Sequence, residues 1–156
     1  MAENEKLAGM VDITKKPPVL RTATAAGSIR LKKSTIEALK AGQVKKGEVL
    51  TTARLAAILA VKDTPRIIPM CHTIPVTGLE VKFELEEERV GVAVTVTSVG
   101  MTGVEMEAMT GVAVALLNIW DMVKYLEKDE TGNYPETGID DIKVLEKIKL
   151  RAATPP

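Results

Sequence analysis

The spacing of hydrophobic residues divides most of the chain into strands and helices. In residues 79–85 and 90–99, apolar side chains alternate with charged or small ones on either side of Glu87-Glu88-Arg89, a pattern typical of a β-hairpin. Extended segments are also predicted over residues 19–31 and 142–148. Helical spacing predicts helices over residues 34–41, 48–62 and 102–127, with Pro65 and Pro69 ending the second.

The order of these elements predicts the fold class. A strand, two helices, a strand hairpin, a long helix and a last strand follow the split β-α-β pattern of ferredoxin-like α+β folds. We therefore expect a four-stranded antiparallel sheet with helices packed on one face. The other face of the sheet, or the apolar long helix, offers surface for self-association. We expect residues 19–150 to form this single domain, between a flexible N-terminal lead-in (residues 1–18) and a C-terminal tail (residues 151–156).

The long helix contains an extended uncharged segment. None of residues 108–120 carries a charge, which predicts a helix covered on most sides, although the run is too short to span a bilayer. The start of this helix, Thr102 with Glu105, has the pattern of a capping box. Ser34 with Glu37 has the same pattern at the start of the first helix.

Ionisable groups stand at both ends of the uncharged run. Glu105 and Asp121 are sixteen residues apart, which places them about 24 Å apart along a continuous helix. They cannot serve one small-molecule site within a single chain at that separation. If both are functional, we expect two copies of the chain to bring opposite helix ends together, as in a two-fold dimer.

The composition of the chain mainly argues against nucleic-acid-binding, membrane-surface and secreted disulfide-bonded proteins. The chain has 156 residues, with 21 basic and 21 acidic side chains and 46% hydrophobic residues, which fits one ordinary globular domain. No basic stripe favours nucleic acid or an anionic membrane surface, so neither is an expected partner. The single cysteine excludes an internal disulfide, and the charged N-terminal residues do not resemble a signal peptide, so we expect a cytoplasmic protein.

Two basic segments are candidates for chemistry. Asp121 and Lys124, three residues apart, share a helix face and can pair. The simplest interpretation is an exposed ion pair of little energetic worth, whereas a lysine buried beside a carboxylate could be tuned for proton transfer. Lys45 and Lys46 precede a helix, where the sequence is consistent with either a solvated lysine pair or a phosphate contact.

The chain's only cysteine and only histidine are adjacent, at Cys71-His72, in an irregular stretch between prolines. One such pair is too few for a structural zinc site, so no metal site is predicted. Histidine suits proton transfer or phosphate binding near neutral pH, although a single histidine is often structural. Glu105 and Glu107 point in roughly opposite directions on a helix, and Met106 between them is most simply a core residue.

Seven short segments are specific in combination. They are Met10-Val11-Asp12-Ile13, Arg21-Thr22-Ala23, Lys46-Gly47-Glu48, Thr52-Ala53-Arg54, Ile68-Pro69-Met70-Cys71-His72, Thr102-Gly103-Val104-Glu105-Met106-Glu107-Ala108 and Asp121-Met122-Val123-Lys124. Together they closely resemble the MoaC family, the cyclic pyranopterin monophosphate synthases of molybdenum cofactor biosynthesis. The resemblance extends over nearly the whole chain, from about residue 10 to residue 147.

The resemblance implies a ferredoxin-like fold and a hexamer built from dimers, with active sites at the dimer interface. The implied reaction, which uses no cofactor, converts 3′,8-cyclo-dihydro-GTP to cyclic pyranopterin monophosphate and releases pyrophosphate, so the protein would be a lyase. By position, the catalytic residues would be Asp121, Lys124 and Lys46. The substrate-binding residues would be Met70, Cys71, His72, Glu105, Met106, Glu107 and Arg21, with the arginine helping the lysines to balance the triphosphate charge.

The C-terminal segment departs from the family. Many bacterial relatives end in a Gly-Gly-Lys-Ser-Gly type tail, whereas this chain continues Asp-Ile-Lys-Val-Leu-Glu-Lys-Ile-Lys. Lys143, Lys147 or Lys149 could take the place of the lysine in that tail. Two alternatives remain open: a non-catalytic oligomeric module that senses a phosphorylated metabolite, and a metal-assisted phosphohydrolase that acts on nucleotides.

Overall fold

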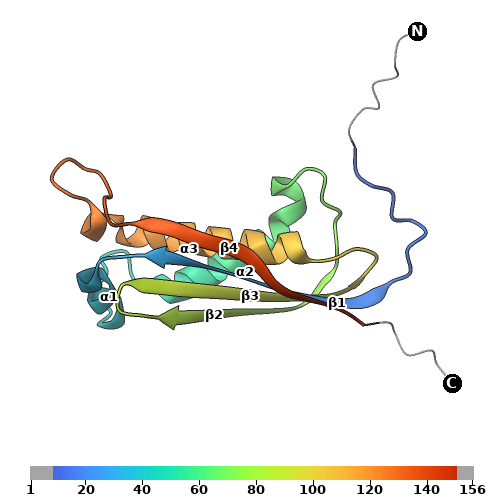
Figure 1. Ribbon diagram of the computed structural model, residues 1–156, viewed down its shortest axis with the longest axis horizontal. Coiled ribbons are helices and arrows are strands. Elements are labelled where there is room, and N and C mark those ends of the chain that lie inside the picture. Colours follow the sequence, from blue (N-terminus) through green and yellow to red (C-terminus); the bar gives the residue numbers. More distant parts are fainter. Residues whose placement is uncertain (1–8, 151–156) are drawn as a thin grey trace, which may run out of the picture.

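The computed structural model describes residues 9–150. In chain order its elements are β1 (Val19–Arg30), α1 (Lys33–Lys40), α2 (Val49–Ile67), β2 (Val76–Leu85), β3 (Arg89–Gly100), α3 (Glu105–Glu127) and β4 (Gly138–Leu150) (Figure 1). The predicted tail, residues 151–156, and the first eight residues of the predicted lead-in lie outside the described residues.

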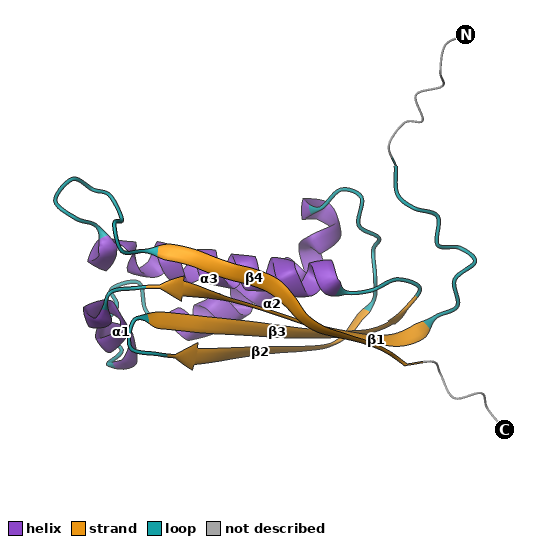
Figure 2. Cartoon of the chain, in the orientation of Figure 1, coloured by secondary structure: helices purple, strands orange, loops and turns teal. Residues whose placement is uncertain are grey.

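The four strands form one antiparallel sheet in the order β2-β3-β1-β4. Helices α2 and α3 pack against each other and against one face of this sheet (Figure 2). The predicted ferredoxin-like α+β fold is therefore confirmed. Its central strands pair in register from Val19 opposite Gly100 to Arg30 opposite Arg89.

Along the central strands, buried residues alternate with partly buried ones, so successive side chains belong to opposite faces of the sheet. The four in-phase valines of residues 90–96 are buried beneath the helices. Thr95 and Thr97, between and beyond them, belong to the opposite face and are only partly buried. On that face the hydroxyls of Thr24 and Thr95 are hydrogen-bonded across the strands at 2.9 Å. The side of the sheet without helices is thus partly polar and partly exposed.

Close packing explains why the middle of α3 is uncharged. Ala108 and Val112 are fully buried, and Gly111 lets the helix approach its neighbours, since a Cβ at Gly111 would lie 2.8 Å from a side-chain carbon of Val61 in α2. Leu117, by contrast, is 58% exposed. The helix is therefore covered on most sides, as predicted, and Leu117 is left at the surface.

The uncharged run of residues 108–120 lies inside a longer helix, α3, of 23 residues. By length and composition alone, α3 could cross a membrane. The core helix of a soluble protein passes the same test, and 56% of the apolar window of α3 is buried inside the fold. Its apolar character is accounted for by packing against the sheet and α2.

Both predicted capping boxes are wrong. Helix α3 begins at Glu105 after the N-cap residue Val104, and α1 begins at Lys33 after Lys32. Neither N-cap side chain makes a capping hydrogen bond. Glu105 instead pairs with Lys147 of β4, with 2.9 Å between the charged atoms. A contact between distant elements has replaced the local one that the sequence pattern suggested.

Helix α2 does not end at Pro65 but continues to Ile67. The proline lies in the last turn, so it removes a helix hydrogen bond only where the helix is about to end. The preceding residue, Thr64, is fully buried, and its hydroxyl donates to the carbonyl of Ala60 at 2.8 Å. Burial and this bond hold Thr64 in the helix despite the proline that follows it.

Two strands begin earlier than the sequence predicts. β4 starts at Gly138, in a polar stretch that resembles a loop, and Gly138 lies opposite Arg30 of β1 in the sheet. The Asp140 carboxylate also accepts a hydrogen bond from Arg30 at 2.9 Å. Asp141 then adopts a φ of 57°, near a shift in strand register. β2 starts at Val76, also beside a register shift. Near these register shifts, the alternation of apolar and polar residues does not reveal where β2 and β4 begin.

Candidate active site

The candidate residues divide into two groups, one at each end of α3. Near its C-terminal end, Lys46, Asp121 and Lys124 form a group that we call the lysine cluster. Near its N-terminal end, Glu105 and Glu107 line a cavity. Because α3 is a continuous helix, about 24 Å along its axis separates Glu105 from Asp121.

The lysine cluster joins two segments that are distant in the sequence. Lys46 Nζ, from the loop before α2, donates to Asp121 Oδ2 at 2.9 Å and to the Asp121 main-chain oxygen at 3.2 Å. Lys124 Nζ lies 3.0 Å from the other carboxylate oxygen, Oδ1. The predicted pairing of Asp121 with Lys124 is therefore confirmed, and Lys46 joins the same carboxylate.

The cluster is open to solvent. The side chains of Lys46, Asp121 and Lys124 are 45%, 55% and 41% exposed, so the hypothesis of a buried lysine is wrong. Hydrogen bonds from Lys46 and Lys124 lower the pKa of Asp121, and the bond to Asp121 raises the pKa of Lys124. One carboxylate thus stands between two ammonium groups at neutral pH. The net positive charge suits a polyphosphate.

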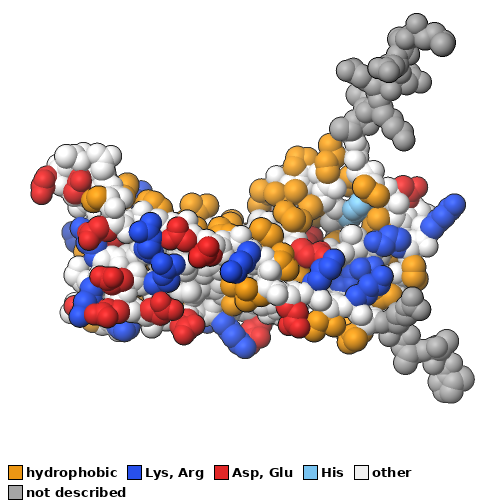
Figure 3. Space-filling model, viewed as in Figure 1, with side chains coloured by type: hydrophobic (Ala, Val, Ile, Leu, Met, Phe, Trp, Pro, Cys, Tyr) orange, Lys and Arg blue, Asp and Glu red, His pale blue; other side chains and the backbone are white. Residues whose placement is uncertain are grey.

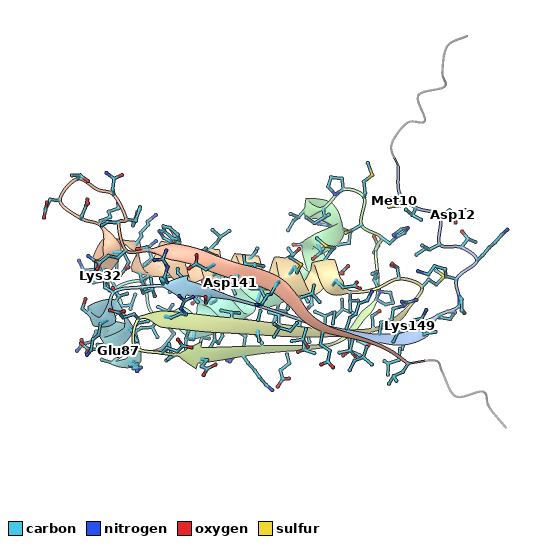
Figure 4. The ribbon with its side chains drawn as sticks, in the orientation of Figure 1. Met10, Asp12, Lys32, Glu87, Asp141 and Lys149 are labelled. Atoms are coloured by element: carbon cyan, nitrogen blue, oxygen red, sulfur yellow. The ribbon has the colours of Figure 1, made fainter. Side chains whose placement is uncertain are left out.

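The cavity at the other end, which we call the histidine pocket, has a volume of about 380 Å³. It is lined by six of the predicted substrate-binding residues, namely Met70, Cys71, His72, Glu105, Met106 and Glu107. Asp12, from the segment before β1, also lines it, at the end of the molecule opposite Lys32 and Glu87 (Figure 4). The histidine is visible at the surface among hydrophobic and charged side chains (Figure 3).

The segment before β1 fixes the hydrogen-bonding state of His72. Its ring atom Nε2 lies 2.6 Å from the carbonyl oxygen of Val11. Because a carbonyl oxygen only accepts hydrogen bonds, this contact requires the hydrogen to be on Nε2. The Nδ1 atom of the neutral ring is then an acceptor. His72 can therefore receive a hydrogen bond from a substrate bound in the pocket.

In the histidine pocket, burial raises the pKa of one carboxyl, that of Glu107, and of the Cys71 thiol. Glu107 is 3% exposed, and burial raises the pKa of its carboxyl, with a further rise from the charge of Glu105. Burial and the charge of Glu107 likewise raise the pKa of the Cys71 thiol. Within residues 9–150, no three histidine, cysteine or acidic side chains are grouped so as to hold a metal ion.

Glu105 borders a second, smaller hollow. Burial raises the pKa of its carboxyl, but the hydrogen bond with Lys147, its own amide and the charges of Lys147 and Arg21 outweigh this effect, and the pKa is lowered overall. Arg21 is 9% exposed, and its Nε donates to the carbonyl of Gly100 at 2.9 Å. Arg21, Glu105 and Lys147 line a hollow of about 90 Å³. In one chain, Arg21 therefore lies at the opposite end of α3 from the lysine cluster.

The two methionines of the pocket are surface residues. Met106 is 40% exposed, so its interpretation as a core residue is wrong. Met70 is 52% exposed. Both residues line the histidine pocket, and their flexible thioether side chains can adapt to the shape of a ligand.

The contacts of two side chains in the last turn of α3, Tyr125 and Glu127, were not predicted from the sequence. Glu127 is fully buried and accepts hydrogen bonds from the hydroxyls of Thr35 and Thr137. The Tyr125 hydroxyl accepts a hydrogen bond from the main-chain amide of Lys45 at 2.8 Å. No short motif could have revealed these contacts, because Thr35 and Lys45 are 92 and 80 residues from their partners.

The domain is ferredoxin-like, with a cationic cluster at one end and a histidine pocket at the other. These are features of a protein that binds an anionic small molecule. The chain belongs to the MoaC family, whose model matches residues 10–149. The match spans both the lysine cluster and the histidine pocket.

Proteins of several archaea are similar over nearly the whole chain. A probable cyclic pyranopterin monophosphate synthase of Methanococcoides burtonii is 60% identical over 140 residues, which cover 90% of this chain and 88% of that protein. One from Methanosarcina mazei is 59% identical over 145 residues, or 93% and 92% of the two chains. A Methanothermobacter thermautotrophicus protein, 55% identical over 147 residues (94% and 92%), is named a probable cyclic pyranopterin monophosphate synthase accessory protein.

Proposed function

We propose that the chain is a cyclic pyranopterin monophosphate synthase, a lyase that converts 3′,8-cyclo-dihydro-GTP to cyclic pyranopterin monophosphate and pyrophosphate. Membership of the MoaC family and the names of relatives about 60% identical support this activity. The structural observation that carries the proposal is the lysine cluster, where Asp121 contacts both Lys46 and Lys124.

The lysine cluster has the charges that the last part of this reaction needs. Closing the cyclic phosphate forms a P–O bond from a substrate hydroxyl and breaks the P–O bond to pyrophosphate. Lys46 and Lys124 would balance the charge that develops on the departing pyrophosphate. Asp121, kept ionised by both lysines, would accept the hydroxyl proton. Asp121 and Lys124 would also serve as an acid/base couple while the purine-derived ring opens and recloses.

The histidine pocket would orient the substrate. His72 offers Nδ1 as an acceptor because Nε2 is engaged by Val11. Glu107 has a raised pKa and, when protonated, can donate a hydrogen bond to a purine-derived ring. Arg21 and Lys147 add positive charge beside Glu105. These groups suit a ligand that carries both a polar ring system and phosphates.

Two copies of the chain would combine the two groups into one active site. The axial separation of about 24 Å between Glu105 and Asp121 supports a two-fold dimer, in which opposite ends of two α3 helices meet. Exposed apolar residues on the helical side, Leu55, Leu59 and Leu117, supply surface for association. A hexamer of three such dimers, located in the cytoplasm, completes the proposal.

Turnover of enzymatically prepared 3′,8-cyclo-dihydro-GTP tests this function directly. The wild-type protein should release pyrophosphate and yield a pterin that becomes fluorescent on oxidation. Both products should be lost in Lys124→Ala and Asp121→Ala. Wild-type protein that binds the compound and leaves it unchanged would overturn the proposal in favour of a metabolite sensor.

A further inference from the structure

We propose that Tyr125 is a positioning residue for Lys46, because its hydroxyl holds the loop of residues 43–47 against α3. This inference rests on the proposed catalytic role of Lys46. The Tyr125 hydroxyl binds the main-chain amide of Lys45, one residue before Lys46. Through this bond it acts on the position of the loop and not on the charged groups of Lys46 and Asp121.

Contacts from two consecutive loop residues reach the same part of α3. The Lys45 amide donates to the Tyr125 hydroxyl at 2.8 Å, and Lys46 Nζ donates to Asp121 Oδ2 at 2.9 Å. Asp121 and Tyr125 are four residues apart, one turn along the same face of the helix. The tyrosine bond therefore places the main chain of Lys46 within reach of Asp121.

The rest of the loop is fixed on its other side. Val44 is 6% exposed, and the Gly47 amide donates to the Val44 carbonyl at 3.0 Å. Gly47 has a φ of 106°, a conformation that favours glycine. Lys45 and Lys46 lie at the exposed outer side of this turn. Their main chain is joined to α3 by the Tyr125 hydroxyl.

A lysine side chain needs such a main-chain anchor because it is long and flexible. Holding its ammonium group at one position costs side-chain entropy, and that cost rises if the loop also moves. The Lys45 ammonium lies 5.3 Å from the centre of the Tyr125 ring, a cation–π contact that would survive loss of the hydroxyl. The hydroxyl can therefore be tested separately from the ring.

Tyr125→Phe removes only the oxygen that binds the loop. We expect kcat to fall about threefold to tenfold, because a single hydrogen bond orients a catalytic group. KM and the thermal midpoint should change little. The effect should act through Lys46, so in a Lys46→Ala background the same substitution should produce no further loss in kcat, measured as single-turnover pyrophosphate release where steady-state turnover is too slow to follow.

Tyr134, the chain's other tyrosine, gives a comparison at the same end of α3. Its ring packs edge-on against Trp120, with 5.5 Å between ring centres, and its phenol contributes, after Asp121, to the raised pKa of Lys124. Tyr134→Phe therefore removes a phenol hydroxyl near Lys124 while leaving the bond between the Tyr125 hydroxyl and the Lys45 amide intact.

The outcomes separate this inference from the proposed function. Full activity of Lys46→Ala would overturn both, since Lys46 would have no catalytic role. If Lys46→Ala is impaired, unchanged kcat in Tyr125→Phe would overturn the positioning role alone. An equal loss from Tyr125→Phe in both backgrounds would also overturn it, because the tyrosine would then act independently of Lys46.

Discussion

The Lys46 ammonium group lies 2.9 Å from the Asp121 carboxylate, although 75 residues separate the two in the chain. Lys124 contacts the other oxygen of the same carboxylate at 3.0 Å. Asp121 is thus the one anion that both cations share. Removing it would leave two like charges close together without their common partner, while hardly affecting the packed core, because all three side chains are exposed to solvent.

Asp121→Asn should therefore separate catalysis from stability. We expect kcat/KM to fall about a hundredfold or more, because the substitution removes the proton acceptor and disorders both lysines. The thermal midpoint should move by no more than about 2 °C, as is usual for exposed ion pairs. Steady-state pyrophosphate release and differential scanning calorimetry measure the two quantities.

A matched control is available on α2. Asp63 and Arg66 form another exposed pair three residues apart, with 4.0 Å between charged atoms. Asp63→Asn removes the same charge from the same kind of helix position and should leave turnover unchanged. Equal losses in the two variants would mean that Asp121 acts through net charge alone.

Lys147 should prove to be the functional lysine of β4. Its contact with Glu105 places it beside the histidine pocket, whereas Lys143 lies opposite Ala26 on the sheet face without helices. Lys147→Ala removes the ion-pair partner of Glu105 and leaves only the more distant charge of Arg21. We expect KM to rise about tenfold from the lost charged hydrogen bond and the added repulsion of an anionic substrate. Lys143→Ala is the control, and a similar KM for both variants would contradict this assignment.

Spacing within one element was predictable from the sequence, and contacts between elements were not. The alternation of residues 79–85 and the three-residue spacing of Asp121 and Lys124 are set by strand and helix geometry. Glu105 fits a capping box equally well, yet Lys147 binds it from another element. Lys46 was linked to Asp121 only through resemblance to a family. The contact between Tyr125 and the loop had no signal, because pairing across 80 residues depends on the whole fold.

Glu107 should make stability depend on pH with a definite sign. Burial raises the pKa of its carboxyl above the ordinary value of 4.5. Between 4.5 and the folded-state pKa, the folded chain binds more protons at this site than the unfolded chain does. The contribution of Glu107 to the free energy of unfolding is therefore fully present below 4.5 and falls as pH rises through this window.

Glu107→Gln, which cannot ionise, isolates this effect. The free energy of unfolding of the variant relative to wild type should increase as pH rises through that window and then become constant, which urea denaturation from about pH 4 to about pH 8 can measure. Asp121→Asn provides a comparison of opposite sign. The lowered pKa of Asp121 gives a contribution that is fully present above the ordinary value of 3.8 and is lost as pH falls through the folded-state value, so this comparison is measured below pH 3.8. A relative stability of Glu107→Gln that does not vary with pH would contradict the raised pKa.

A shared active site predicts that two inactive variants can restore each other. His72→Ala removes a group from the histidine pocket, and Lys124→Ala removes one from the lysine cluster. In a mixed two-fold dimer, one site contains both substitutions and the other contains neither. Random exchange makes half of the dimers mixed, so about a quarter of all sites should recover.

The experiment mixes the two variants, allows the subunits to exchange and follows pyrophosphate release over time. Activity should rise from the level of either variant alone towards about a quarter of wild type. Two variants of the same group, Lys46→Ala and Lys124→Ala, serve as the control: every site in their mixed dimer retains one substitution, so mixing them should restore nothing. Mass spectrometry shows whether the subunits have exchanged. If they have, and the mixture of His72→Ala with Lys124→Ala still gains no activity, each chain has its own active site. The separation of about 24 Å along α3 would then have to be bridged by a different arrangement.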